Sequence, residues 1–440
     1  MTEVNTKADQ ENVLNRAIGK LGFGAININS VIGAGIFGLP AVVAAKAGYF
    51  SPWAFLLGGA LVFTIVLSFA RAASMFRSTG GAIVYASHAF GPFVGFQTGW
   101  LAYLARVTAM GANTNLLVTY ASWFWAPLDG DPWRAIALTV LISTLTWLNV
   151  AGVKNSVGIT YIFTVLKLVP LSLLILFGLG KVDVGMLMHG ADLPEFGKLG
   201  EIILVLLYAY VGFEGTVVNA GEGKSPRKDL PGALINTIIF IGLFYFLIQL
   251  VTMFTLPGLA TSSAALADTA FVLFGRAGAA MLIMGAVFSI GGNLSASLLS
   301  APRMTYALAR DGTMPRWFAG VHTHYRTPHH SIWFYGFLCL AMALSGSFIW
   351  LAVMSTLVRL LTYMVCIAAL PILEKTTEAY EGQFTIPGGL LIPVIAFGIC
   401  IWLLTHASAD AWLTMLAFFV AGSGLYWYST RWGAASIVKQ

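Results

Sequence analysis

The chain has 440 residues, of which 58% are hydrophobic and only 10% are charged, and its net charge at pH 7 is +6. An ordinary soluble domain carries about 25% charged residues, so this composition excludes a soluble protein and indicates a surface that meets lipid. Apolar runs of about 20 residues, each able to cross a hydrocarbon core of about 30 Å, recur along the whole chain. We therefore predict one all-α integral membrane protein, and we attribute the basic excess to cytoplasmic segments rather than to nucleic-acid binding.

The chain begins with a polar segment, residues 1–20, which holds no short apolar core of the kind that a cleavable signal peptide needs. We expect this segment to be a cytoplasmic tail and the first span to act as its own insertion signal. The third of the spans below is the longest, and its first part, around residues 82–96, is expected to lie at the membrane interface. The apolar runs predict twelve transmembrane helices, at residues 21–46, 52–75, 84–126, 133–150, 156–179, 200–222, 232–255, 270–300, 329–346, 348–371, 388–406 and 410–430.

The placement of the basic residues indicates the orientation. Of the 24 lysines and arginines, three lie deep inside predicted spans, five lie in outer segments or at the outer ends of spans, and sixteen lie in segments or span ends that are inner if both termini are cytoplasmic. The five on the outer side are Lys46, Arg134, Lys181, Lys198 and Arg276. This excess follows the positive-inside rule. We therefore expect a multi-pass protein of the cytoplasmic (inner) membrane with both termini in the cytoplasm.

Two of the predicted spans are interrupted by glycines at corresponding places in the two halves of the chain. The first span carries the run GAGIFGLP at residues 33–40, and the sixth carries YAYVGFEG at residues 208–215. A glycine inside a helix destabilises it by about 1 kcal/mol relative to alanine. Unpaired backbone at membrane depth is tolerated only where it is buried in protein or lines a cavity. Matching interruptions of this kind are typical of a transporter's binding site.

The chemistry of two such breaks suits a zwitterion. The half-helix after the first break would offer the free amides of Ala34, Gly35 and Ile36, with the positive end of its dipole, to a carboxylate. The half-helices that end at the breaks would offer free carbonyls to an ammonium group. The alternative is that these glycines serve helix packing alone, as small residues often do in membranes. The matching break in the sixth span favours the binding site.

The motifs around these breaks resemble those of a known family. The run at residues 33–40 resembles the first-helix motif of the amino acid–polyamine–organocation permeases. Similar motifs stand at residues 78–92, 208–215, 222–231 and 303–315. On these motifs, which lie between residue 21 and about residue 371, the chain is identified as a member of that superfamily.

The resemblance implies a five-plus-five inverted repeat in the first ten spans, with spans one and six broken, and two additional helices at the C-terminal end. The domains expected on this basis are a cytoplasmic tail at 1–20, a ten-helix transport core at 21–371, a cytoplasmic loop at 372–387, two further transmembrane helices at 388–430, and a cytoplasmic tail at 431–440.

The resemblance also implies alternating access around a site between spans one, three, six, eight and ten. Tyr208 takes the position of a tryptophan that caps the substrate in the arginine/agmatine antiporter of this family, so a capping role is expected for it. Carried over by position, the amides of Ala34, Gly35 and Ile36 would bind the substrate's carboxylate. The carbonyls of Val31, Tyr208 and Val211 would bind its ammonium group.

Lys167 lies in the middle of the fifth span, where a charge is a functional candidate because it is costly at membrane depth. It resembles a lysine that replaces the coupling ion in proton-coupled relatives, and its ammonium is expected to bond the carbonyls near Ser30 and Val31. Burial disfavours the charged form of a lysine, so proton release during transport is possible. The alternative is a static tether between helices. Ser295 and Ser297 in span eight are expected to complete this coupling site.

Arg106 in span three departs from the arginine-transporting relative, which has a small uncharged residue there. One interpretation is that Arg106 receives a side-chain carboxylate of the substrate. The other is that it pairs with Glu214, which leaves a neutral pocket. Glu214 either holds a proton or pairs with Arg106 or Arg359, and Arg359 is interpreted as structural. Met110, one turn after Arg106, is expected to face the same cavity.

The sequence therefore predicts a proton-coupled secondary active transporter of neutral or acidic, rather than cationic, amino acids. An amino acid or amine exchanger without proton coupling is the alternative, and a channel is a less favoured one. No enzymatic activity, cofactor or metal site is expected. Cys339, Cys366 and Cys400 all fall inside spans, so no disulfide-linked partner is expected, and the protein is expected to be a monomer or a homodimer in the bilayer.

Overall fold

The computed structural model describes residues 18–76, 80–152, 157–189, 192–380 and 382–433. These residues form helices joined by turns, and the only strand-like pairing within them is a parallel bridge between Ile18 and Gly223. The helices of the first part of the chain are α1 (Lys20–Val31), α2 (Ala34–Gly38), α3 (Pro40–Ala47), α4 (Ser51–Met75), α5 (Ala82–Phe90), α6 (Pro92–Ser122), α7 (Trp133–Val150), α8 (Val157–Gly178) and α9 (Val184–His189). Those of the second part are α10 (Phe196–Leu206), α11 (Phe213–Val218), α12 (Pro226–Thr255), α13 (Ala265–Arg310), α14 (His329–Ser345), α15 (Phe348–Thr376), α16 (Leu391–Leu404) and α17 (Ala409–Tyr428).

Local sequence explains where many of these helices begin. A proline occupies one of the first two positions of α3, α4, α6 and α12, where its missing N–H has no intrahelical partner to lose. The hydroxyls of Ser347 and Ser408 cap α15 and α17 by accepting hydrogen bonds from the amides of Trp350 and Ala411. The predicted spans at 52–75, 133–150, 329–346 and 410–430 agree with α4, α7, α14 and α17 to within two residues.

Eight helical segments in the described part of the chain are long and apolar enough to cross a membrane, and a pair bent by 43°, Phe196–Ala209 with Phe213–Glu222, brings the number to nine. The all-α membrane architecture is therefore confirmed. A count of twelve also needs α6, α14 and α16 as spans. Of these, α14 and α16 are short, with 17 and 14 residues, and α6 carries several buried polar side chains.

Two predicted spans contain an interruption that the sequence did not lead us to expect. The third span, predicted as 84–126, is two helices, because Gly91 adopts a left-handed conformation with φ of 87° between α5 and α6. The eighth span, predicted as 270–300, belongs to α13, which continues to Arg310 and is kinked at Gly275, where φ is 67°. Left-handed backbone of this kind favours glycine and interrupts a helix.

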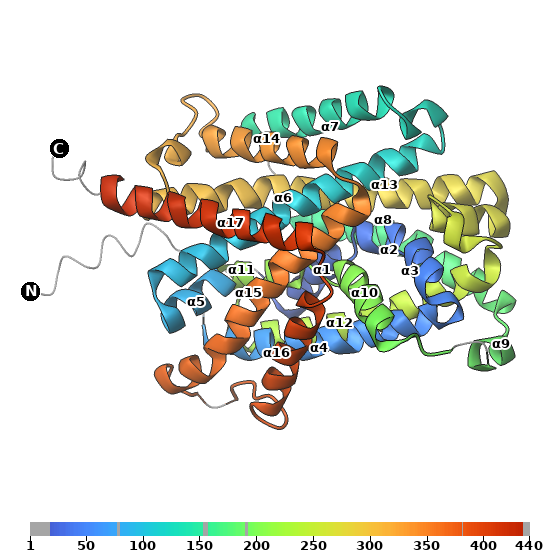
Figure 1. The fold of residues 1–440 in the computed structure, drawn as a ribbon, viewed down its shortest axis with the longest axis horizontal. Helices are drawn as coiled ribbons and strands as arrows, with labels where there is room; N and C mark the ends of the chain where they lie inside the picture. Colours follow the sequence, from blue (N-terminus) through green and yellow to red (C-terminus); the bar gives the residue numbers. More distant parts are fainter. Residues whose placement is uncertain (1–17, 77–79, 153–156, 190–191, 381, 434–440) are drawn as a thin grey trace, which may run out of the picture.

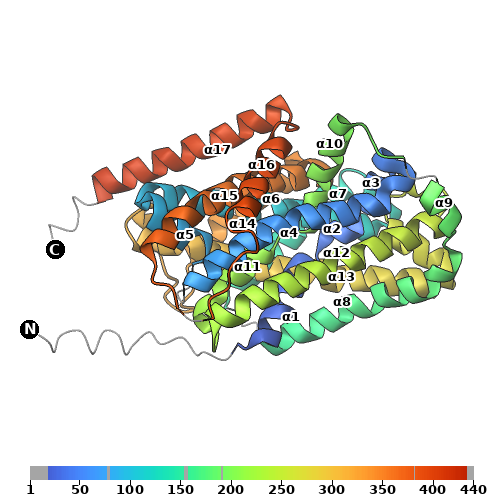
Figure 2. The ribbon, with the colours of Figure 1, turned by 90° about the horizontal axis from the view of Figure 1, so that it is seen from below.

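The helices form one bundle with the broken spans inside it. Figures 1 and 2 show α4 and α12 side by side, with α7 and α17 at the margins of the bundle. In the centre, α1 packs on α11, and α2 packs on the single helical turn Leu207–Ala209. The two interrupted spans therefore meet in the interior, where α6, α13 and α15 also pass.

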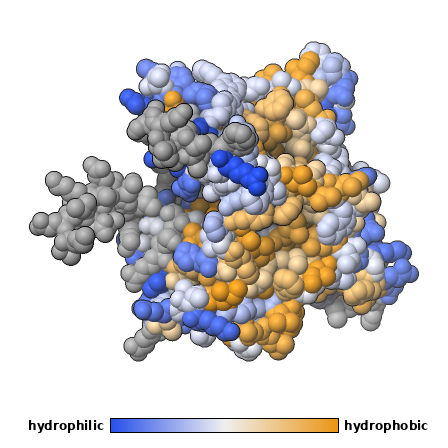
Figure 3. All heavy atoms as spheres, turned by 60° about the vertical axis from the view of Figure 1, so that its left-hand side comes forward, coloured by the Kyte–Doolittle hydropathy of each residue, from blue (hydrophilic) through white to orange (hydrophobic). Residues whose placement is uncertain are grey.

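The outer surface has the character expected of a lipid-facing one. Only 22% of the apolar window of α7 and 17% of that of α17 are buried, and large hydrophobic side chains are exposed along both helices and along α8. Figure 3 shows hydrophobic residues covering much of one face, with hydrophilic residues along its margins. Cys339, Cys366 and Cys400 are buried in α14, α15 and α16. Most of the predicted terminal tails, at 1–20 and 431–440, lies outside the described residues.

Candidate functional site

The first break lies between α1 and α2, at Ile32 and Gly33. Ile32 has φ −74° and ψ 91°, and Gly33 has φ −130° and ψ −142°, so neither residue is in a helical conformation. A Cβ on Gly33 would lie 2.5 Å from the side-chain nitrogen of Asn293 on α13. That nitrogen donates a hydrogen bond of 3.3 Å to the carbonyl of Ser30. The break predicted from the glycines is present, and an amide from α13 is bound against it.

The second break is centred on Gly212, between the turn Leu207–Ala209 and α11. Gly212 has φ 119°, and a Cβ there would lie 2.5 Å from the carbonyl oxygen of Ser30. On the other side of the contact, a Cβ on Gly35 would lie 2.5 Å from the Cα of Ala209. The two breaks therefore touch backbone to backbone, and glycine is required at both contacts. From the sequence, the amide of Gly35 was expected to bind a carboxylate; in this conformation Gly35 lies against Ala209 of the other broken span.

A cavity of about 430 Å³ lies beside the two breaks, within the range of about 300–1,000 Å³ that is usual for small-molecule sites. Its walls come from α1, α6, the second break with α11, α13 and α15, which belong to predicted spans one, three, six, eight and ten. Asn29 and Ser30 reach it from α1, and Met110 and Asn113 reach it from α6. The structure therefore has a cavity large enough for a small molecule between the spans that the resemblance implied.

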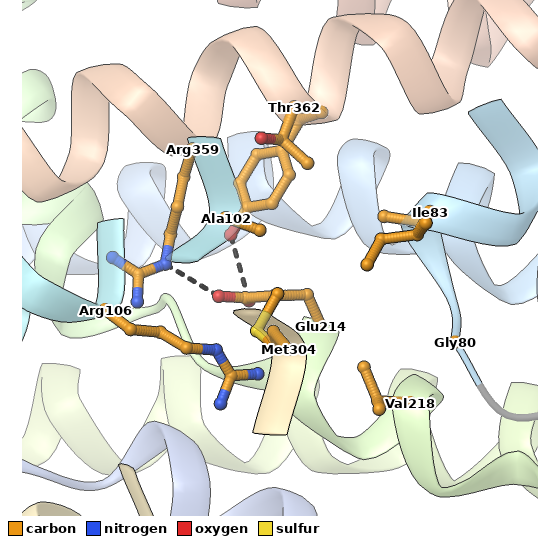
Figure 4. A pocket seen from close by; sticks show the side chains of 11 residues that line it. Gly80, Ile83, Ala102, Arg106, Glu214, Val218, Met304, Arg359 and Thr362 are labelled. Carbon is orange, nitrogen blue, oxygen red and sulfur yellow. Dashed lines mark hydrogen bonds and ion pairs between the residues drawn. The ribbon is translucent and has the colours of Figure 1, made fainter. Parts of the chain in front are cut away.

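Glu214, at the start of α11, is bound by three groups from three directions. Its Oε1 accepts a hydrogen bond of 2.7 Å from Nε of Arg359 (Figure 4). Its Oε2 accepts bonds from the hydroxyl of Tyr363 at 3.0 Å and from the amide of Gly212 at 2.9 Å. Nη1 of Arg359 also donates to the carbonyl of Ala105 on α6 at 3.3 Å. This ion pair joins the second break to α15 and α6. Arg359, interpreted from sequence as structural, also lines the cavity.

Arg106 does not pair with Glu214, and that interpretation of the sequence is corrected. Its Nη1 instead donates a hydrogen bond of 2.7 Å to the hydroxyl of Ser300 on α13. Figure 4 shows the guanidinium of Arg106 on the other side of Glu214 from Arg359. Both carboxylate oxygens of Glu214 are already bound by Arg359, Tyr363 and Gly212. Arg106 lines the cavity together with Met110, as expected.

Lys167 is fully buried and bonds the open end of α1. Its Nζ donates to the carbonyl of Ile32 at 2.7 Å and to that of Asn29 at 3.1 Å, which flank the Ser30–Val31 pair expected from the sequence. Ser289, which the sequence analysis missed, donates to the same Ile32 carbonyl at 3.1 Å. The lysine therefore satisfies carbonyls that the first break leaves without helical partners.

The serine assignment at this lysine needs correction. Ser297 bonds the hydroxyl of Tyr335 at 2.7 Å and lines the cavity. It lies eight residues beyond Ser289, about 12 Å further along α13. Ser295 is six residues from Ser289, about 9 Å along the helix, so it too lies away from the Ile32 carbonyl that Lys167 binds. The sequence signal was ambiguous because serines recur along this span and only the register of α13 against α1 selects one.

Tyr208 stands beside the cavity without lining it. Its hydroxyl donates a bond of 2.6 Å to Oδ1 of Asn113, and its ring meets that of Phe348 edge-on at 5.9 Å. Among the described residues that line the cavity, none of the carried-over backbone positions is found. Five of those positions are at most 8% exposed: Val31, Ala34, Ile36, Tyr208 and Val211. The sixth, Gly35, is also buried.

Three asparagines at the site were missed by the sequence analysis: Asn29, Asn113 and Asn293. Each is an amide inside an otherwise apolar span, and that contrast was the signal available in the sequence. Oδ1 of Asn29 is buried without a hydrogen-bond partner, although Asn29 lines the cavity. In the part of the chain that the structure describes, no group of three His, Cys, Asp or Glu side chains gathers as a metal site would.

Comparison with known proteins identifies the family. Residues 21–430 match a family model described as amino acid permease. The chain belongs to this family. The membership in the amino acid–polyamine–organocation permeases that the motifs indicated is thus confirmed.

Three curated relatives from Bacillus subtilis (strain 168) show the range of the permeases that resemble this one. The chain is 29% identical over 404 residues to the serine/threonine exchanger SteT, covering 88% of this chain and 90% of that protein. It is 26% identical over 427 residues to a methylthioribose transporter, covering 92% and 91%. It is 25% identical over 437 residues to the branched-chain amino acid permease BcaP, covering 93% and 91%. This permease is therefore a multi-pass membrane transporter, and its relatives differ in what they carry.

Proposed function

We propose that this permease is a secondary active transporter of neutral or acidic amino acids across the cytoplasmic membrane, working by alternating access. The observation that carries the proposal is the cavity of about 430 Å³ where two broken helices meet. Its charged lining includes Arg106 and Arg359 against Glu214 and Glu222, so it holds no surplus of acid that would attract a cationic side chain.

The proposed membrane topology has twelve spans and a five-plus-five inverted repeat. Such a repeat has five equivalent pairs, and four of them are in contact: the broken spans one and six, α4 and α12, α6 and α13, and α7 and α14. Contacts between equivalents are expected where two halves interlock around a central axis. This packing supports the repeat, with α16 and α17 as the two additional helices.

The conformation is proposed to be inward-facing. The cavity lining includes Ile18, just before α1, and Glu222, just before α12, in segments assigned to the cytoplasmic side by the charge bias. It also includes the exposed residues Ala296 and Ser300. Toward the outer side, Phe348 packs so closely on Gly38 that a Cβ there would lie 2.4 Å from its ring. Substrate would leave on the Ile18 side in this state.

Substrate binding is proposed to use the backbone at the breaks. When the two breaks separate, the amides of Ala34, Gly35 and Ile36 become available to the carboxylate. The ammonium group is proposed to bind the carbonyls of Val31, Tyr208 and Val211. In the present conformation these groups are buried by the contact between the two breaks. This burial supports the proposal that the structure represents a state after substrate release.

Proton coupling is proposed to act through Lys167. A protonated lysine binds the carbonyls of Asn29 and Ile32 and so holds the end of α1 in place. Loss of its proton removes a charge-assisted hydrogen bond and frees α1 to move at the break. Exchange without proton coupling remains the alternative mechanism, in which the lysine is a fixed tether.

The test is counterflow and net uptake by the purified protein in proteoliposomes, screened against the twenty amino acids and common amines at two pH values. We expect saturable uptake of neutral or acidic amino acids that an inward proton gradient increases. Excess arginine or lysine displacing the substrate best would contradict the proposal. A channel would give uptake that does not saturate, and a protein that is no transporter would give none.

A further inference from the structure

Arg106, which is partly exposed to the cavity, differs from the buried cations Lys167 and Arg359 because it has no carboxylate or backbone carbonyl partner in the described part of the chain. Arg359 is bound to Glu214 at 2.7 Å, and Lys167 is bound to two carbonyls. For Arg106, among the residues that the structure describes, no Asp or Glu oxygen lies within 4.0 Å, and the hydrogen bond that its guanidinium makes goes to the neutral hydroxyl of Ser300. A positive charge at membrane depth without a counter-charge is expensive and marks a functional residue.

The guanidinium of Arg106 lies at the level of the second break. Its Nη2 is 3.7 Å from the position that a Cβ on Gly215 would take, and Gly215 is one residue after Glu214. Because Gly215 has no side chain, the guanidinium fits against α11 between that helix and Ser300 on α13. It therefore lies against α11, four residues (about one helical turn) after Val211, whose carbonyl is one of the groups proposed to bind the ammonium.

The acids of the cavity do not neutralise this charge. Glu214 is bound by Arg359, so that pair is neutral as a unit. Glu222 is seven residues beyond Gly215, at the end of the turn Asn219–Glu222 that continues α11. It is therefore at least about 10 Å from Gly215 along that helix. It lies at the mouth of the cavity beside Ile18. The inner part of the cavity thus keeps one unpaired positive charge.

The guanidinium also keeps donors free for a ligand. Arginine has five N–H donors in a planar fork, and the bond to Ser300 uses Nη1. The remaining donors suit a carboxylate bound through both oxygens, which is a strong and geometrically specific contact. The hydroxyl of Ser300 donates to the carbonyl of Ala296 in its own helix, so it accepts from Arg106 and orients the guanidinium.

We propose that Arg106, oriented by Ser300, is an anion subsite for the substrate's side chain, and that the transported amino acid is therefore dicarboxylic, of the aspartate or glutamate type. This inference rests on the proposed function and narrows it. The backbone at the two breaks binds the groups that all amino acids share, and Arg106 selects the side chain.

The experiment compares matched acid and amide ligands. Binding of glutamate and glutamine, and of aspartate and asparagine, is measured on the purified full-length protein by calorimetry, and each pair is then tested in counterflow. The members of a pair have nearly the same size and differ by one charge. We expect the acid to bind on the order of ten-fold to a hundred-fold more tightly than its amide, as one charge-assisted hydrogen-bond pair supplies.

Variants then assign the effect to the residue. Arg106→Gln is expected to remove the preference, with acid affinity falling by that factor and amide affinity changing less than about two-fold. Arg106→Lys keeps the charge without the fork and is expected to keep part of the preference. Arg303→Gln is the control: Arg303 is on the same helix as Ser300, bonds the Leu299 carbonyl within that helix, and lines no part of the cavity. It is expected to leave the preference unchanged.

The possible results separate the two proposals. Wild-type protein that binds and transports an amide or another neutral amino acid as well as or better than the acid overturns the inference and leaves the proposed function intact. Loss of the preference in Arg303→Gln as well as in Arg106→Gln also overturns it. No binding or flux with any amino acid overturns the proposed function and the inference together. If Arg106→Gln does not fold, the wild-type comparison and Arg106→Lys still decide.

Discussion

At the scale of single residues, the site has three cations inside the spans, each with a different kind of partner. Arg359 binds a carboxylate, Lys167 binds two carbonyls, and Arg106 binds a hydroxyl. The sequence shows that each cation lies inside an apolar run, and so identifies all three as important. It does not show which acid each one meets, because Glu214 is 108 residues from Arg106 and 145 from Arg359. The choice depends on how α6, α11 and α15 are rotated against one another.

Lys167→Met tests the role of the second of these cations. Methionine keeps the length and most of the volume but leaves the carbonyls of Asn29 and Ile32 without the lysine. We expect a loss of stability on the order of 1–3 kcal/mol, seen as a lower melting temperature, because buried acceptors lose a charged donor. We also expect uptake to become insensitive to an imposed pH gradient. Initial uptake rates in proteoliposomes, with and without the gradient, measure this.

The control for Lys167→Met is Ser289→Ala, which removes a neutral donor from the same Ile32 carbonyl. It is expected to lower the melting temperature by a smaller amount and to leave the dependence on the pH gradient in place. Full gradient-driven uptake in Lys167→Met would show that the lysine is a static tether. An equal loss of gradient dependence in Ser289→Ala would show that any weakening of the first break is sufficient.

At the scale of elements, the breaks were predictable and their contact was not. Glycines at 33, 35 and 212 indicate interruptions because helices tolerate glycine poorly, and α1, α2 and α11 indeed end or begin there. That Gly35 meets Ala209 while Gly212 meets Ser30 depends on how two helices more than 170 residues apart are packed. The break at Gly91 was missed for a different reason. The apolar run continues across it, and only the Gly-Pro pair at 91–92 indicates the interruption.

Gly212→Ala tests whether the contact between the breaks is needed. An alanine would have to hold φ of 119° and place its Cβ 2.5 Å from the Ser30 carbonyl, so the two breaks must move apart. We expect a loss of about 1–3 kcal/mol in stability from the strained conformation alone and a large loss of transport. The matched control is Gly291→Ala on α13, where a Cβ would meet nothing within 4 Å.

In that control, alanine is expected to leave the melting temperature and the uptake rate unchanged or slightly raised, because alanine favours a helix over glycine. Thermal unfolding and uptake of the same preparations provide both readings. Normal stability and transport in Gly212→Ala would mean that the breaks are free to separate without cost, and that their contact does not define this conformation.

At the scale of the whole molecule, the direction in which the cavity opens links the fold to the transport cycle. The charge bias assigns the segments around Ile18 and Glu222 to the cytoplasm, and both residues line the cavity. In the proposed orientation, the contact of Phe348 with Gly38 and the ring of Tyr208 against Phe348 close the outer side. The two breaks could be predicted from the sequence and are present; the orientation stays a prediction from the charge bias, and the end at which the cavity opens depends on the packing of all five central spans.

Single cysteines test this direction. Ala296 is exposed and lines the cavity, and Ala260 is exposed in the turn Leu259–Thr261, which the charge bias places outside. The three native cysteines are buried and free, so they are expected to react slowly with a membrane-impermeant thiol reagent. In this conformation Ala296→Cys should be labelled from the cytoplasmic side of oriented vesicles, and Ala260→Cys from the outer side. Substrate should slow the first reaction and not the second.

The two positions distinguish an error in orientation from an error in conformation. If Ala260→Cys were labelled only from the cytoplasmic side, the charge-based orientation would be wrong. If Ala260→Cys reacted from outside and Ala296→Cys did too, the cavity would open outward and Phe348 would not close it. Labelling of Ala296→Cys from the inner side in the absence of substrate, with protection by substrate, is the result that an inward-facing carrier predicts, because the ligand and the reagent then compete for one cavity.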